Sequence, residues 1–327
     1  MSNAVSQRKQ AFFEVPCSGE FVSASCPLPP RDGVHASCVV LPHETWPSLL
    51  AYLTQRFAHV ADSWQHRLAA GELWDDAGQP LPPDSPYRAG QRLWYFRSVD
   101  AETPVPFDID ILYRDDSLLV VDKPHFLACV PGGRHLRETV LTRLRRDPSL
   151  AEASPIHRLD RETAGVMLFC LQPSARGAYQ RLFASREVHK QYEAIGRYRA
   201  DLALPLHYRS RLQELPGGFV MQEVAGEPNS DTLIECMQQR GAWAQYRLTP
   251  GSGKKHQLRA HLAALGIPIA NDPWYPVFHN DKAADDFSRP LALLARRIAF
   301  IDPIDGRERV FDSRRALSWP QEDTCCN

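Results

Sequence analysis

The chain has 327 residues and a formal net charge of −1, and its length predicts about two domains. Hydrophobic residues make up 43% and charged residues 24%, which favours a folded protein with a sizeable core and excludes a disordered chain. No stretch approaches the roughly eighteen apolar residues of a membrane span, and the N-terminus lacks a secretory signal, so we expect a cytoplasmic protein without a membrane partner. Because the charges nearly balance, a nucleic-acid partner would have to bind local basic patches.

The eight cysteines and twelve histidines show no pattern that predicts a disulfide framework or a metal site. The cysteines form no C-x-x-C pair, and the histidines show no H-E-x-x-H spacing. We therefore expect reduced, mostly buried thiols and no bound metal.

The first hundred residues predict two different kinds of structure. Residues 1–45 carry scattered proline, glycine and cysteine with little periodicity, which predicts an irregular N-terminal arm. Residues 46–98 instead place apolar side chains at helical spacing in WPSLLAYLTQRFAHV and again in SWQHRLAAGEL, and they end in the β-like run RLWYF. This order predicts a compact α/β module of two short helices followed by a small sheet.

The remaining chain predicts a larger domain over residues 99–320 and a short tail over residues 321–327. DAETPVPFDIDI at 100–111 is typical of a linker or an edge strand, and the apolar runs LLVVD and VMLFCL are typical of buried strands. Helices are predicted at 174–188 and 254–265. Many successive strands with a few helices predict an α+β fold, with a mixed, largely antiparallel sheet flanked by helices.

The stretch HRLDRETAG, residues 157–165, places Asp160 between Arg158 and Arg161 just before a predicted buried strand. A carboxylate flanked by cations is expected to stay ionised, and a fixed carboxylate can act as a nucleophile or stabilise a developing cation. The small residues that end the stretch, up to Gly165, allow another backbone or a substrate to come close. A salt bridge within a surface loop is the alternative explanation of this motif.

Two later stretches carry further candidate residues. VHKQYEA places Lys190 and Tyr192 at the start of a predicted strand. PGSGKKHQLRAH enters a predicted helix with Lys254, His256 and Arg259 in its first turns, and a helix N-terminus with added cations can bind an anion. A solvated, basic start of a helix is the alternative explanation.

Together these motifs resemble the RluA family of pseudouridine synthases. The family pattern is a strand ending in Lys-Pro, then H-R-L-D-R/x-x-T-S/A-G, then K-x-Y, then G-R/K-x-H-Q-I/L-R-x-H followed by G-x-P-I. Here these motifs are DKPHF, HRLDRETAG, KQY and GKKHQLRAHLAALGIPI, in the same order and with similar spacing, and the resemblance covers about residues 112–315. Three positions depart from the pattern: an alanine replaces the commoner serine at 164, a lysine replaces the usual arginine at 254, and LLARR at 293–297 lacks a frequent histidine.

The resemblance implies a role for each of the candidate residues. Asp160 corresponds to the catalytic carboxylate, Tyr192 to a tyrosine that stacks on the uracil, and Arg259 to the basic partner of the aspartate. The residues that it implies for substrate binding are Arg161, Lys190, Lys254, His256 and Leu258. Arg158 and His157 are expected to be structural, locking the loop. The implied activity is the isomerisation of specific uridines to pseudouridine in ribosomal or transfer RNA by a monomer without a cofactor.

Two other functions stay open at this point. A non-catalytic RNA-binding protein could retain the synthase fold, although intact Asp160, Tyr192 and Arg259 argue against it. A carboxylate-dependent hydrolase would need a second acid at suitable spacing, and none is identifiable. Residues 46–98 more faintly resemble the RNA-binding module named for the S-four ribosomal protein. Because basic residues are few there, a degenerate module that only packs on the rest is an equal alternative.

Overall fold

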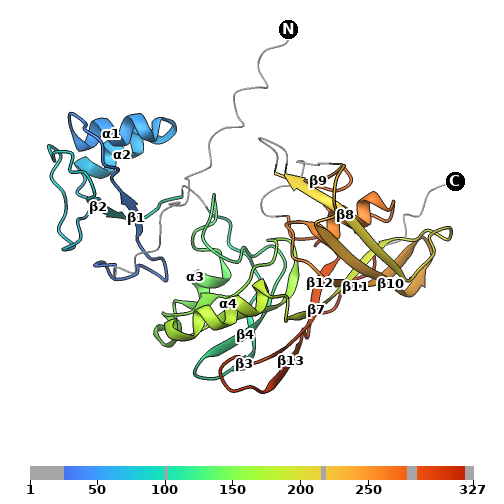
Figure 1. Ribbon diagram of the computed structural model, residues 1–327. Helices are drawn as coiled ribbons and strands as arrows, with labels where there is room; N and C mark the ends of the chain where they lie inside the picture. Colours follow the sequence, from blue (N-terminus) through green and yellow to red (C-terminus); the bar gives the residue numbers. More distant parts are fainter. Residues whose placement is uncertain (1–25, 100–101, 215–218, 278–285, 321–327) are drawn as a thin grey trace, which may run out of the picture.

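The computed structural model describes residues 26–99, 102–214, 219–277 and 286–320. Figure 1 shows a small N-terminal domain that stands beside a larger body built around one sheet. Most of the predicted arm and the whole predicted tail lie outside the described residues. No helix in the described ranges is long and apolar enough to cross a membrane.

The small domain consists of two helices that pack on a two-stranded sheet. Helix α1 (Leu49–Arg56) begins where the Ser48 side chain accepts a hydrogen bond from the backbone N–H of Ala51, a common helix cap. A 3-10 turn, η1 (Ala58–Val60), leads into α2 (Ala61–Ala69). Leucines from both helices and from the sheet, among them Leu49, Leu53, Leu68 and Leu93, are fully buried in a core separate from that of the body.

One strand of the small domain lies where the sequence predicts only irregular chain. Strand β1 (Ser37–Val40) pairs antiparallel with β2 (Arg92–Tyr95), so that Cys38 lies opposite Trp94. A run of only four residues is too short to show a clear period, and its partner lies more than fifty residues later in the chain. The predicted arm over residues 1–45 is therefore not irregular at 37–40, and the small domain begins earlier than residue 46.

The body contains an eleven-stranded sheet in the order β3-β4-β6-β12-β7-β11-β10-β8-β9, with β13 paired to β12 and β5 to β6. Strands β6 and β12 form the only parallel pair among the described strands, so the fold is α+β with a mixed, mostly antiparallel sheet, as predicted. The strands are β3 (Asp110–Arg114), β4 (Leu118–Lys123), β5 (Ser154–Pro155), β6 (Ala164–Cys170), β7 (His189–Arg197), β8 (Leu206–Glu214), β9 (Met221–Val224), β10 (Ser230–Arg240), β11 (Trp243–Pro250), β12 (Leu293–Ile301) and β13 (Glu308–Asp312).

The helices of the body explain why β4 and β6 are apolar without alternation. Helix α3 (Val140–Leu144) packs with Leu119 and Met167 on one face, whereas α4 (Arg176–Ala184) packs with Val120 and Leu168 on the other. Strands that are buried on both faces need apolar side chains at every position. The remaining short turns are η2 (Pro148–Leu150) and η3 (Pro173–Ala175).

The bounds of two predicted helices differ from those in the structure. Helix α5 is Gln257–Ala264, because His256 has a left-handed backbone (φ 52°) that cannot continue a helix; Lys254 therefore lies in a turn before it. The helix predicted over 174–188 ends at Ala184.

At Gly165 the backbones of two strands come close together, as the small residues of this stretch predicted. Its φ is +116°, and a Cβ atom there would lie 2.2 Å from the carbonyl oxygen of Ala295 on β12. The parallel pairing of β6 with β12 therefore requires glycine at this position.

Candidate active site

A cleft of about 870 Å³ lies between the Asp160 loop, strand β7 and the turn that precedes α5. Asp160, Tyr192 and Arg259 all line it, although they are far apart in the sequence. Lys190, Lys254, His256 and Leu258 line the same cleft. The structure does not bring Arg161, the remaining predicted substrate-binding residue, to the cleft wall.

The Asp160 loop is fixed from behind by Lys123, the last residue of β4. The Lys123 ammonium is completely buried and donates to the carbonyl oxygens of Pro124, Leu127 and Arg161, at 2.9, 2.8 and 3.0 Å. Burial lowers the pKa of Lys123 to about 8. Because these bonds join two loops, Lys123 holds the backbone next to Asp160 in one position. Lys123 belongs to the Lys-Pro motif of the sequence, but no role was predicted for it.

The Asp160 carboxylate is partly exposed to the cleft and lies near two side chains that are remote in sequence, the cation Arg259 and the imidazole of His256. Its Oδ2 lies 3.3 Å from Nη1 of Arg259, and its Oδ1 lies 3.9 Å from Nε2 of His256. The flanking arginines do not hold it, contrary to the expectation from the sequence. Arg161 pairs instead with Glu162 at 2.5 Å, and Arg158 is exposed.

Arg259 is held in turn by a buried carboxylate that the sequence reasoning missed. Its Nε and Nη2 donate to the two oxygens of Asp272 at 2.8 and 2.6 Å, and its guanidinium lies 4.3 Å from the ring centre of Trp274. Burial alone would lower the pKa of Arg259, but hydrogen bonding to Asp272 and the charges of Asp272 and Asp160 raise it overall. The arginine therefore stays charged, with one nitrogen left for Asp160.

Asp272 is itself fixed by backbone donors. Its Oδ1 accepts from the N–H groups of Trp274 at 2.9 Å and Tyr275 at 3.2 Å. Asp272 lies in the segment NDPWY, which follows the G-x-P-I part of the last motif. An acidic residue directly after this motif could have indicated a partner for Arg259.

Tyr192 projects from β7 toward the same cleft. It packs against the hydrophobic clusters on both sides of the site, one of them containing Leu159 and the other Leu258. Burial, and after it the charge of Asp160, raises the pKa of Tyr192. The phenol is therefore neutral at physiological pH, with its ring fixed beside the carboxylate.

The predicted substrate-binding residues differ in how they are held. Nζ of Lys190 lies 3.4 Å from the carbonyl oxygen of Ser252, and burial lowers the pKa of this lysine. His256 contacts the hydroxyl of Tyr275 at 3.2 Å, and burial lowers its pKa to about 4. At neutral pH His256 is therefore uncharged. Of the predicted substrate-binding residues that line the cleft, two are lysines, Lys190 and Lys254.

The two residues expected to lock the loop behave differently. His157 accepts a hydrogen bond from the backbone N–H of Leu168 at 3.1 Å, and its ring stacks on Phe183 at 4.8 Å. These contacts support its structural role. The Arg158 side chain makes no hydrogen bond or ion pair with any described residue and lines the cleft, so it does not lock the loop.

An aromatic wall on the far side of the cleft was not predicted. The rings of Phe219 and Trp274 meet edge to face at 4.6 Å, and both line the cleft. Nζ of Lys255 lies 4.5 Å from the Phe219 ring centre and pairs with Glu214 at 2.6 Å. Among the described residues, no three His, Cys, Asp or Glu side chains lie together in a way that could hold a metal ion.

Comparisons with known proteins identify relatives of this chain. The sequence model of a family described as RNA pseudouridylate synthase matches residues 117–264. An uncharacterized RNA pseudouridine synthase of Synechocystis sp. is 31% identical over 234 residues, which cover 69% of this chain and 79% of that protein. The Dual-specificity RNA pseudouridine synthase RluA of Haemophilus influenzae is 31% identical over 66% of this chain and 97% of its own length.

A solved structure shares the fold. Human RNA Pseudouridylate Synthase Domain Containing 1 superposes with a TM-score of 0.53 at 23% identity, covering 66% of this chain and 86% of that one. The sheet and the matched motifs thus define an isomerase of the RNA pseudouridine synthase class. Within that class, the chain belongs to the RluA family.

Proposed function

We propose that this enzyme isomerises specific uridines in structured ribosomal or transfer RNA, with Asp160 as its catalytic carboxylate. It acts as a cytoplasmic monomer. Two relatives support this range of targets by their names: the H. influenzae protein is called dual-specificity, and a Xanthomonas campestris relative, 30% identical over 256 residues, is a Ribosomal large subunit pseudouridine synthase D. Residues 99–320 are the proposed catalytic domain, and 46–98, extended by β1, a degenerate S-four-like module.

The observation that carries the proposal is the chain of charges Asp160–Arg259–Asp272. Of these three side chains only Asp160 is exposed, with a quarter of its surface accessible; Arg259 lines the cleft but is buried, and so is Asp272. A carboxylate held by a buried cation, which is itself hydrogen-bonded to a second carboxylate, is arranged in advance for charge that develops in front of it.

During the reaction, positive charge develops on the sugar. The bond between C1′ of the ribose and N1 of uracil breaks, and a bond from C1′ to C5 replaces it. The proton on C5 is lost, and N1 gains one, so the product is an isomer of the substrate. As the uracil leaves as an anion, the sugar becomes cationic. The Asp160 carboxylate can stabilise or trap that sugar or remove its neighbouring proton.

Tyr192 has a different proposed role, because the target uridine must leave its base stack to reach Asp160. A ring fixed beside the carboxylate can stack on the extruded uracil. Stacking of a base on an aromatic ring contributes roughly 1–3 kcal/mol, which offsets part of the cost of unstacking. Lys190 and Lys254 are proposed to contact phosphates near the target.

The test is pseudouridine mapping by carbodiimide-dependent stops of reverse transcription, in RNA from cells with and without the protein. We expect one or a few stops to disappear in the deletion strain and in an Asp160→Asn strain. An Asp116→Asn strain is the matched control, because Asp116 is an exposed acid in a turn away from the cleft. Stops that persist with Asp160→Asn would refute the catalytic role and favour an RNA-binding protein that retains the fold.

A further inference from the structure

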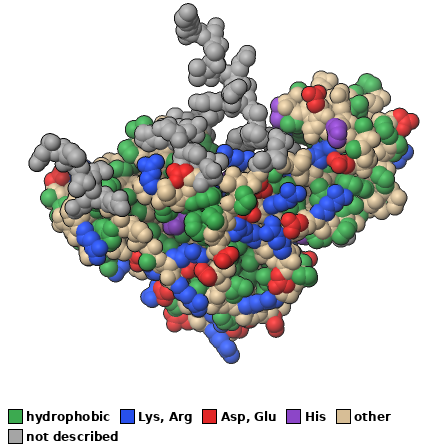
Figure 2. Space-filling model, turned by 180° about the vertical axis from the view of Figure 1, so that it is seen from behind, with side chains coloured by type: hydrophobic (Ala, Val, Ile, Leu, Met, Phe, Trp, Pro, Cys, Tyr) green, Lys and Arg blue, Asp and Glu red, His purple; other side chains and the backbone are tan. Residues whose placement is uncertain are grey.

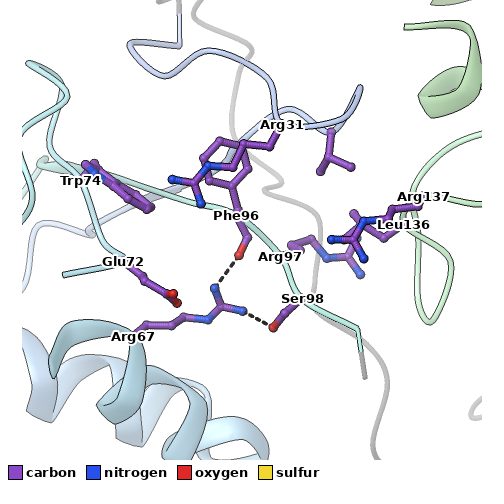
Figure 3. A pocket seen from close by; sticks show the side chains of 10 residues that line it. Arg31, Arg67, Glu72, Trp74, Phe96, Arg97, Ser98, Leu136 and Arg137 are labelled. Atoms are coloured by element: carbon purple, nitrogen blue, oxygen red, sulfur yellow. Dashed lines mark hydrogen bonds between the residues drawn. The ribbon is translucent and has the colours of Figure 1, made fainter. Parts of the chain in front are cut away.

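A second pocket, of about 190 Å³, lies where the small domain meets the body, and the mechanism does not use it. Figure 3 shows the side chains that line it, which include the arginines Arg31, Arg67, Arg97 and Arg137. The one acidic side chain in this lining is Glu72. The pocket therefore combines four guanidinium groups with a single carboxylate.

Arg67 is a buried cation that no carboxylate neutralises. The residue is 7% exposed, and its guanidinium donates to the side chain of Ser63, the carbonyl oxygen of Phe96 and the side chain of Ser98. Figure 3 shows the last two bonds at the edge of the pocket. All three acceptors are neutral, and Glu72 forms no ion pair with Arg67 although both are described. Buried charges in proteins are normally paired, so this site is short of one negative charge.

Two further arginines add exposed positive charge to the same pocket. The Arg31 guanidinium lies 4.2 Å from the ring centre of Phe96 and 5.3 Å from that of Trp74, which holds it over the pocket. Arg137 projects from the opposite side, on a loop of the body (Figure 3). Neither of these two side chains forms an ion pair with a carboxylate anywhere in the described part of the chain.

The pocket is held in shape by a turn that docks on the body. Asp32 and Gly33 form the tip of this turn, and a Cβ atom on Gly33 would lie 2.3 Å from the carbonyl oxygen of Thr142 on α3. Asp32 also pairs with Arg146 at 3.1 Å. Because Arg31 precedes this turn directly, its guanidinium is positioned before any ligand arrives.

The loop that carries Arg137 is basic and lies near Arg161, the neighbour of Asp160 in the chain. Arg137 lies two residues after His135, whose pKa is lowered to about 4 by burial and then by the charges of Arg161 and Arg134. Those charges are therefore near His135, and Arg161 directly follows Asp160. Figure 2 shows the molecule from behind. On that face, Lys and Arg side chains gather near the centre, where the small domain meets the body.

We infer that the junction pocket binds a backbone phosphate of the RNA substrate, at a point outside the catalytic cleft. The inference rests on the proposed function, since it takes the ligand to be the RNA that is modified. Guanidinium groups that already have fixed positions bind phosphate oxygens through charge-assisted hydrogen bonds. The near-neutral chain would thus acquire a local phosphate site where its two domains meet.

The test uses the full-length protein with Arg31→Gln and Arg137→Gln together, two exposed positions whose change leaves Arg67 and the fold intact. The probe is total RNA from the deletion strain, bound at several KCl concentrations. We expect about tenfold weaker binding at low salt and a slope of log affinity against log salt that is smaller by about one. The rate of pseudouridine formation at saturating RNA should not change. Arg88→Gln is the matched control, because Arg88 is an exposed arginine of the same domain that does not line the pocket.

The possible failures are distinguishable. If the double variant binds RNA with the same affinity and salt slope as Arg88→Gln, the pocket does not hold the RNA backbone and the inference is wrong. A pocket that binds only a free anion or another protein would give this same result. If instead the wild-type protein forms no pseudouridine in any RNA, the proposed function fails, whatever the variants bind.

Discussion

At the scale of single residues, the position of Asp160, the proposed catalytic carboxylate, depends on a side chain that does not line the cleft. Asp272 neutralises Arg259 and sets its orientation through two parallel hydrogen bonds. One nitrogen of the guanidinium then remains directed at Asp160. Asp272 is therefore a positioning residue, which acts on the reaction only through Arg259.

We expect Asp272→Asn to lower both stability and turnover. Removing one charge of a buried ion pair costs about 3–5 kcal/mol, because the other charge stays buried. Loss of the fixed geometry should lower kcat roughly a hundredfold, with little change in RNA binding. Urea unfolding and single-turnover assays measure the two effects.

Asp312→Asn is the control for that change. Asp312 also makes two hydrogen bonds to an arginine, Arg297, but both side chains are about half exposed. An exposed pair contributes at most about 1 kcal/mol, so this variant should be nearly as stable as the wild type. Equal stability of the two variants would contradict the role given to Asp272.

At the scale of elements, the contact between β6 and β12 sets the width of the site. Asp160 lies just before β6, and Tyr192 lies on β7, with β12 between these two strands in the sheet. The backbones of β6 and β12 meet at Gly165, where there is no room for a side chain. A displacement of β12 there would move Asp160 relative to Tyr192.

We predict that Gly165→Ala destabilises the protein by about 3 kcal/mol or more, because the added methyl would overlap backbone atoms of Ala295 at a positive φ. Gly306→Ala is the matched control. Gly306 also has a positive φ, +73°, but no atom lies within 4 Å of the added Cβ, so only the backbone cost of about 1 kcal/mol applies. Thermal and urea unfolding of both variants test this; similar losses would mean that the close approach is not needed.

At the scale of the whole molecule, four histidines have strongly lowered pKa values; His256 and His261 are buried, and His135 and His157 are half-buried. Burial lowers the pKa of His157 to about 3 and the pKa values of His135, His256 and His261 to about 4, from an ordinary value of 6.5. Well above pH 6.5, from about pH 7.5, these groups are neutral in both the folded and the unfolded chain. Between pH 6.5 and 4 the unfolded chain binds protons that the folded chain does not, so the free energy of unfolding falls.

We therefore expect stability to be constant above about pH 7.5 and to fall steeply below pH 6.5, with uptake of roughly four protons on unfolding near pH 5. Urea unfolding at a series of pH values gives this number from its slope. A His157→Gln variant should take up about one proton fewer. Stability that is unchanged between pH 7 and pH 5 would show that these histidines titrate normally in the folded protein.

The sequence predicted those parts that depend on local pattern. The apolar runs at β4 and β6 predicted buried strands, and the ordered motifs predicted that Asp160, Tyr192 and Arg259 belong to one site, whose cleft they line. What it could not predict are partners that only tertiary packing selects. Arg161, beside Asp160 in the chain, pairs with Glu162 instead of Asp160. Asp272, the buried partner of Arg259, was not predicted at all.

The place of β12 in the sheet has a consequence for how the enzyme is made. This strand lies between β6 and β7, yet a ribosome synthesises it after all three proposed catalytic residues. A nascent chain that ends before residue 293 would carry Asp160, Tyr192 and Arg259 without the strand that aligns them. The enzyme would then gain its activity only late in translation, after β12 has emerged and joined β6 and β7.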